Sequence, residues 1–132
     1  MLVDTNVVSE LMRARSSPAV IAWAERQETM SLSVITLEEI LVGLSYRPSV
    51  RMERWFEDFV DARCEVFPVT ASIARRSALL RGGLRRGGKQ RTQADMLIAA
   101  TALEHNVALA TRNTKDFEGC GVALVNPFEA AI

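Results

Sequence analysis

The feature that most constrains this chain is an alternation of short apolar runs and amphipathic helical patterns along all 132 residues. Apolar, β-forming runs predict strands at 2–3, 29–35, 65–69, 107–110 and 122–125. Between these runs, apolar residues recur at helical spacing. Strands that alternate with helices favour a parallel sheet covered by helices on both faces. No linker divides the chain, so we expect one α/β domain over residues 1–132.

Composition narrows the class of protein without identifying its role. The hydrophobic fraction of 48% and the charged fraction of 24% are those of an ordinary globular protein. Acidic and basic residues number 16 each, so net charge provides no global attraction to nucleic acid. No apolar run approaches the ~20 residues of a membrane span. The N-terminus lacks a signal-peptide pattern, and Cys64 and Cys120 fit buried apolar positions in a reducing compartment, so we expect a cytoplasmic protein.

Four acidic residues stand where strands are expected to give way to helices or turns. Asp4 follows the first strand, Glu39 follows the second, Asp95 heads an alanine-rich helix, and Asp116 follows the strand at 107–110. The carboxyl ends of parallel strands share one edge of a sheet, where open α/β folds bind ligands. Four carboxylates gathered there would repel one another without a cation, and Mg²⁺ is held by oxygen ligands of this kind. We therefore expect a metal-dependent enzyme that acts on phosphates.

Each acid also has a purely structural explanation. The alternatives are a helix N-cap for Asp4, a capping box for Thr36 with Glu39, a second one for Thr92 with Asp95, and a polar turn at 113–116 for Asp116. Capping does not require all four carboxylates to lie at the same edge of the sheet, whereas metal binding does. The joint placement therefore favours the metal site.

Four segments, in order along the chain, resemble the sequence motifs of PIN-domain nucleases. They are residues 3–11, 35–43, 95–102 and 109–117, which carry the four acids in turn. Residues 125–128, Val-Asn-Pro-Phe, resemble the tail of the VapC/FitB branch of that family. Any one motif is weak evidence for the resemblance, but four in series over nearly the whole chain are strong evidence for it.

The resemblance implies a three-layer α/β/α fold with a parallel sheet of about five strands, a usual sheet size. It also implies a ribonuclease that uses Mg²⁺ or Mn²⁺. Most short, single-domain members of the family are toxins of bacterial toxin–antitoxin pairs. The expected partners are therefore an RNA substrate, a cognate antitoxin and a second copy of the chain. An antitoxin arginine that blocks the acidic site is a further hypothesis.

The resemblance also assigns roles to individual residues. Asp4, Glu39 and Asp95 correspond to the family's core acids and are expected to hold the cation. Asp116 is expected to complete the site, directly or through a water, and relatives that carry an acid at the position of Asn113 leave that residue as an alternative. The residues expected to orient the site are Asn6, Thr111 and Asn113.

His105 and two further groups of residues each allow both a functional and a structural interpretation. His105, the single histidine, is expected at a helix end, so Asp116 or metal-bound hydroxide is the better candidate to manage a water. The basic residues Arg85, Arg86, Lys89 and Arg91 either follow an RNA backbone or form a solvated helix end and loop. The stripe of Met52, Trp55, Phe56 and Phe59 fits either the core or a protein interface.

Two other functions remain as alternatives. One is a PIN scaffold that binds RNA without cleaving it. The other is a receiver-type or other ligand-binding α/β domain, although the chain lacks the early acidic pair and the late lysine that a receiver needs. Transfer, messenger and ribosomal RNA are all open as targets.

Overall fold

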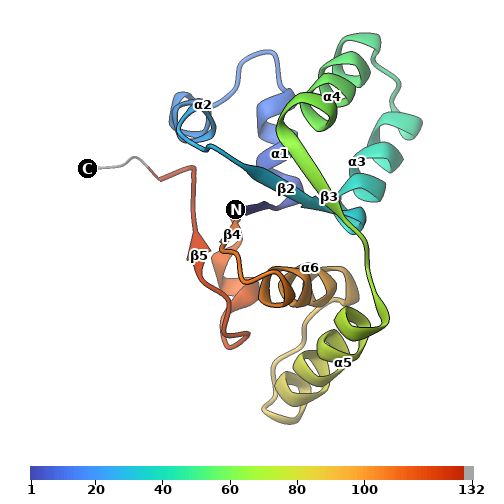
Figure 1. Ribbon diagram of the computed structural model, residues 1–132, viewed down its shortest axis with the longest axis vertical. Coiled ribbons are helices and arrows are strands. Elements are labelled where there is room, and N and C mark those ends of the chain that lie inside the picture. The colour runs from blue at the N-terminus through green and yellow to red at the C-terminus, as the bar shows by residue number, and fades with distance from the viewer. Residues whose placement is uncertain (130–132) are drawn as a thin grey trace.

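A five-stranded parallel sheet organises the chain, and the computed structural model describes residues 1–129 (Figure 1). The strands are β1 (Leu2–Val3), β2 (Met30–Ser33), β3 (Cys64–Phe67), β4 (Leu109–Ala110) and β5 (Leu124–Val125), in the order β3-β2-β1-β4-β5. The helices are α1 (Thr5–Met12), α2 (Pro18–Glu25), α3 (Val34–Tyr46), α4 (Val50–Arg63), α5 (Ala71–Arg86), α6 (Gln93–Glu104) and the 3₁₀ helix η1 (Thr114–Phe117).

Helices cover both faces of the sheet, which confirms the expected three-layer α/β/α fold. Figure 1 shows α1 to α4 on one side of the sheet and α5 with α6 on the other. Neighbouring strand residues face opposite layers, as the pleat requires. Leu2 of β1 packs with α6, whereas Val3 packs with α1 to α4. The sheet thus separates two hydrophobic cores.

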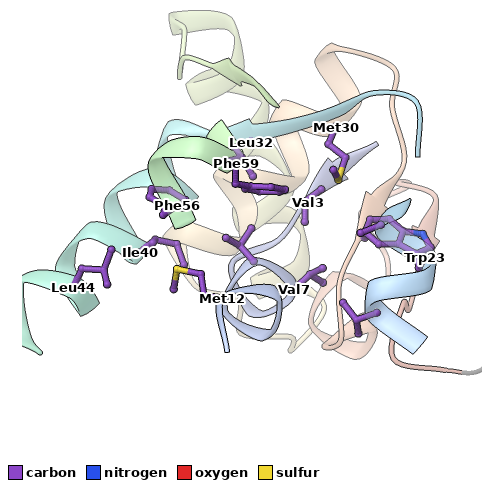
Figure 2. Packing of buried hydrophobic residues seen from close by; sticks show 14 residues of the cluster. Val3, Val7, Met12, Trp23, Met30, Leu32, Ile40, Leu44, Phe56 and Phe59 are labelled. Atoms are coloured by element: carbon purple, nitrogen blue, oxygen red, sulfur yellow. The ribbon is translucent and has the colours of Figure 1, made fainter. Parts of the chain in front are cut away.

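The larger core joins the four helices α1 to α4 to the sheet (Figure 2). Val3 and Val7 are fully buried at its centre, and Phe56 of α4 is 1% exposed. Burying a large apolar side chain contributes roughly 1.5–3 kcal/mol, so this layer dominates the stability of the domain. Phe56 and Phe59 of the predicted aromatic stripe are therefore core residues, and only Met52 and Trp55 are half-buried.

Two arginines of α4 fix the ends of the preceding helices. The Arg51 guanidinium donates to the Met12 carbonyl at the end of α1, at 3.0 Å. Arg63 donates to the carbonyls of Ala24 and Gln27, at 3.0 and 3.2 Å, beside the end of α2. The last carbonyls of a helix lack partners within the helix, and a cation at that end also suits the helix dipole. These contacts set α4 against α1 and α2.

The start of α3 differs from the expected capping box. The helix begins at Val34, and its N-cap is Ser33, whose hydroxyl accepts from the Ile35 amide at 3.1 Å. Strand β2 accordingly ends at Ser33, not near Ile35, because the serine side chain replaces the next strand hydrogen bond with a cap. Thr36 is therefore a buried residue inside the helix. Its hydroxyl is free to contact α1.

The N-cap residues expected for two other helices are confirmed. Asp4 is the N-cap of α1, and Thr92 caps α6 through a 3.1 Å bond from the Asp95 amide to its hydroxyl. Helix α6 therefore begins two residues before Asp95. Helix α5 continues through Gly82 and Gly83 to Arg86, and the turn that ends it places Gly88 at a φ of +82°.

Three smaller expectations concern the two cysteines, the single histidine and whether a helix could span a membrane. Cys120 is buried as expected, whereas Cys64 is half-buried, and both are free thiols. His105 is the exposed C-cap of α6, and its ring stacks on Phe67 with centroids 3.6 Å apart. Among the described residues, no helix combines the length and the apolar character needed to cross a membrane.

Candidate active site

The reversal of strand order lies between β1 and β4, at the centre of the sheet. From β1 the chain moves outward through β2 and β3 on one side, whereas β4 and β5 lie on the other. In open α/β sheets, the crevice for ligands opens beyond the carboxyl ends of the strands at such a reversal. Asp4 directly follows β1, and Thr111 directly follows β4. The two residues therefore line the expected crevice.

Asp4 is a buried carboxylate that is 5% exposed. One of its oxygens accepts from the Thr5 amide at 2.8 Å, and so caps α1. The other accepts from the Thr111 hydroxyl at 2.7 Å and from the Asn6 amide group at 3.2 Å. The capping role and a role in the site are thus compatible, because each uses a different oxygen.

The electrostatic surroundings of Asp4 oppose its ionisation. The pKa of Asp4 is raised to about 6, chiefly by burial; the bonds from Thr111 and Thr5 oppose the rise, and the charges of Asp95 and Glu39 add to it. A pKa near 6 still leaves the carboxylate mostly ionised at neutral pH. The result is a partly desolvated negative charge that a cation would stabilise.

Glu39 reaches the same region from the second turn of α3. Its carboxylate accepts from the Thr5 hydroxyl at 2.7 Å, and the oxygen of that hydroxyl lies 3.1 Å from the hydroxyl of Thr36. Thr5 therefore contacts two of the acids, donating its amide to Asp4 and its hydroxyl to Glu39. The sequence interpretation missed this role, although Thr5 stands directly after Asp4.

Asp95 lies half-buried in the first turn of α6. Burial raises its pKa, Thr92 lowers it through a hydrogen bond, the charges of Asp116 and Glu39 raise it, and Arg91 lowers it. The charge of Asp95 in turn raises the pKa of Asp4. Through these couplings the fold brings Asp4, Glu39, Asp95 and Asp116 into one region of negative charge, although they come from four separate segments.

The segment after β4 carries the remaining site residues. The Thr111 hydroxyl donates to Asp4 and accepts from the Asn113 amide at 3.1 Å and from Asn6 at 3.3 Å. The Asn6 side-chain oxygen accepts from the Arg112 amide at 3.0 Å. Asn6 therefore bridges α1 and this segment, with Thr111 at the centre of the network. The Asn113 and Asp116 side chains are exposed and make no hydrogen bond to another side chain within residues 1–129.

Two observations bear on whether these residues fit a divalent cation. Within residues 1–129 no three His, Cys, Asp or Glu side chains lie close enough together to form a ready-made ion site. The salt bridges of the same residues are Arg13–Glu10 and Arg76–Glu104, so no basic side chain neutralises the four acids by contact. Oxygen donors without a counter-charge suit a hard cation such as Mg²⁺, which keeps several waters and takes one or two carboxylates directly. The donor set therefore fits, with waters completing the ion's shell.

The expected RNA-binding residues fall into two groups. Arg85, Arg86 and Lys89 are exposed at the end of α5 and in the turn after it. Arg91 is half-buried, and its guanidinium donates to the carbonyls of Gln90 at 3.2 Å and Lys115 at 3.3 Å. The first group is available to a polyanion, whereas Arg91 is engaged by the protein itself.

Known proteins resemble this chain over almost its full length. Residues 1–119 match the family described as PIN domain. The chain is 36% identical over 139 residues to a VapC ribonuclease of Sinorhizobium fredii, with 99% of each protein covered. It is 32% identical over 136 residues to toxin FitB of Neisseria gonorrhoeae, with 97% of this chain and 98% of that protein covered. A solved structure of FitAB bound to a DNA fragment matches at 32% identity and a TM-score of 0.85, over 99% of this chain and 97% of that chain.

Proposed function

This chain belongs to the PIN-domain family, and we propose that it is a metal-dependent endoribonuclease that serves as the toxin of a toxin–antitoxin pair. The observation that carries the proposal is the gathering of four carboxylates beyond the centre of the sheet without a basic side chain in contact. Such a concentration of negative charge costs stability in a protein that does not use it. A bound cation offsets that cost and can in turn attract an RNA phosphate.

Asp4, Glu39 and Asp95 are the residues that would hold the ion, one or two of them directly and the rest through its bound waters. A bound divalent cation lowers the pKa of a water and neutralises charge on the reacting phosphate. Asp4 is kept in one orientation by Thr5, Asn6 and Thr111, so its rotamer is fixed before the ion arrives. Glu39 is oriented by Thr5 in the same way. We propose that exposed Asp116 orients the attacking water and accepts its proton.

The names of two relatives and the solved complexes of other relatives suggest which partners this chain has. The relatives include a VapC ribonuclease and toxin FitB, and solved neighbours contain FitAB and VapBC pairs, some of them bound to DNA. We infer that this chain pairs with its own antitoxin, acts on RNA in the cytoplasm and forms a homodimer. The targets compatible with the proposal are transfer, messenger and ribosomal RNA.

Expression in a bacterium tests the function directly. Wild-type protein should arrest growth, whereas Asp4→Ala and Asp95→Asn variants produced at equal levels should not. Purified wild-type protein should release RNA fragments that carry a 5′-phosphate, and a chelator should stop the release until Mg²⁺ or Mn²⁺ is restored. Equal growth inhibition by all three proteins would remove the nuclease-toxin proposal.

The second candidate is a PIN scaffold that binds RNA but does not cleave it. The exposed Arg85, Arg86 and Lys89 would serve either function, so binding alone does not separate the two. Binding with unchanged RNA length in the presence of Mn²⁺ would favour the scaffold. The receiver-type alternative is disfavoured by topology, because receivers have the strand order 2-1-3-4-5 whereas this sheet has the order β3-β2-β1-β4-β5.

A further inference from the structure

Arg91 lies in the segment between α5 and α6, and its side chain and backbone carbonyl together connect three parts of the chain. One guanidinium nitrogen donates to the Lys115 carbonyl in η1 at 3.3 Å, and another donates to the Gln90 carbonyl at 3.2 Å. The Arg91 carbonyl accepts from the Arg81 side chain of α5 at 3.2 Å. Helix α5, the segment before α6 and η1 are therefore joined through this one residue.

The connected segments carry two of the four acids. Lys115 directly precedes Asp116, and only three residues separate Arg91 from Asp95. Neither acid forms a salt bridge with Arg91 within residues 1–129, because its terminal nitrogens are directed to the two carbonyls. Its charge nevertheless acts on Asp95 at longer range and lowers the pKa of that carboxyl. Arg91 is thus a cation whose charge acts on the acidic site without a salt bridge to it.

The buried part of the side chain shows that the position of Arg91 is constrained by packing. Its Nε is buried and has no hydrogen-bond partner within the described residues. Leaving a buried donor unpaired is unfavourable, so a freely placed surface arginine would turn this nitrogen to water. The planar guanidinium reaches two carbonyls at once, which a lysine ammonium on its flexible stem does not reproduce. The arrangement favours a structural tether over a contact with RNA.

We propose that Arg91 is a positioning residue that holds η1 against the start of α6, and so fixes the spacing between Asp116 and Asp95. The inference deepens the proposed nuclease function and rests on it for its catalytic meaning. The tether itself is a property of the folded chain and exists whether or not RNA is cleaved. A misplacement of about 1 Å can cost a hundredfold in rate, so a tether of this kind is sufficient to govern turnover.

Kinetics of Arg91→Gln and Arg91→Lys test the proposal, with Arg75→Gln as the matched control. Arg75 is an exposed residue of α5 whose side chain makes no hydrogen bond or salt bridge within the described residues. Both Arg91 variants should lower kcat for RNA cleavage by about ten- to a hundredfold, with KM changed less than about threefold. A raised KM with an unchanged kcat in Arg91→Gln, restored by Arg91→Lys, would instead show a phosphate contact and overturn the proposal.

Amide hydrogen exchange gives a second readout that does not depend on activity. The Asp116 amide donates to Asn113 at 3.0 Å and the Glu118 amide to Lys115 at 3.3 Å. Both amides should exchange at least about tenfold faster in Arg91→Gln, whereas amides in the middle of α6 should keep their protection. Unchanged exchange at Asp116 and Glu118 would overturn the tether. If the wild type cleaves no RNA while exchange rises in the variant, the nuclease proposal fails and the tether stands.

Discussion

The Thr111 hydroxyl donates a 2.7 Å hydrogen bond to the Asp4 carboxylate, although the two residues are 107 positions apart in the sequence. The bond joins the ends of β1 and β4, the two strands between which the order of the sheet reverses. It also lowers the pKa of a carboxyl that burial raises. Thr111 therefore contributes to both the geometry and the charge of the site.

Replacing Thr111 by Val should shift the pH dependence of cleavage. The variant loses the donor that favours ionised Asp4, so the pKa of Asp4 should rise above its wild-type value of about 6. In a pH–rate profile, the acid limb should then move to higher pH, with a larger loss of activity at pH 6.5 than at pH 8. Thr111→Ser keeps the hydroxyl and should retain the wild-type profile. Superimposable pH–rate profiles for Thr111→Val and wild type would contradict an effect of Thr111 on the pKa of Asp4.

Asp4→Asn should change the pH dependence of stability. The pKa of Asp4 is about 6 in the folded chain against 3.8 for an unperturbed carboxyl, so the folded state binds the proton more tightly. Ionised Asp4 therefore destabilises the fold above pH 6, by about 3 kcal/mol for that shift, and the penalty disappears as pH falls toward 4. Removing the charge should make the variant more stable than wild type at pH 7.5 by about 1 kcal/mol or more.

Urea unfolding at pH 4.5, 5.5 and 7.5 measures this effect. The difference between Asp4→Asn and wild type should grow as pH rises from about 4 to about 6 and then level off. Asp61→Asn, a change at an exposed acid of α4, provides the matched control and should show a difference that is nearly independent of pH. A variant that is less stable than wild type by the same amount at every pH would show that the hydrogen bonds of Asp4 outweigh its buried charge.

Divalent cations should stabilise the wild-type chain in a manner that depends on Asp4. An ion that binds the folded state alone raises Tm by mass action. Mn²⁺ or Mg²⁺ at pH 7.5 should therefore raise Tm, with a smaller shift at pH 5, because Asp4 is then largely protonated. Asp4→Asn should lose most of the shift, and sodium chloride at equal ionic strength provides the control. An equal shift in both proteins would place the ion elsewhere.

Thr5→Val should lower the affinity of the same site for a divalent cation, because Thr5 orients Glu39 of α3. The Thr5 hydroxyl donates to Glu39 at 2.7 Å, so its loss frees the glutamate side chain to rotate. Residues that orient a metal ligand typically account for 10- to 100-fold in metal affinity or activity. The apparent affinity for Mn²⁺, measured by calorimetry, should fall by about tenfold, and Thr5→Ser should restore it. Unchanged affinity in Thr5→Val would exclude Glu39 as an oriented ligand.

Arg85→Ala combined with Arg86→Ala tests the basic end of α5. If both arginines contact RNA phosphates, the slope of log affinity against log salt should become shallower by about 1.4, because each contact with a single strand contributes about 0.7. Arg15→Ala is the matched control, since Arg15 is an exposed arginine beyond the end of α1 and outside the basic segment of α5. The same slope in the double variant and in wild type would identify the segment as a solvated helix end.

The order of strands and helices followed from the sequence, because hydrophobic periodicity is a local property of neighbouring residues. The runs at 2–3 and 107–110 predicted β1 and β4, and the helical patterns that follow Asp4 and Asp95 predicted α1 and α6. The same locality explains why the capping role of Thr92 was predictable, since its bond to the Asp95 amide spans three residues. The start of α3 was misplaced because Ser33 and Thr36 are both plausible caps, and only packing of Thr36 against Thr5 distinguishes them.

The sequence by itself determined which residue types this protein has available, namely four carboxylates on four segments of an α/β chain. Only the tertiary structure decided how those groups act on one another. The bonds from Thr5 to Glu39 and from Thr111 to Asp4 connect residues 34 and 107 positions apart, and the tether from Arg91 to η1 spans 24. Hydrogen bonds and charge couplings depend on distance in space, which chain folding sets and local sequence patterns do not contain.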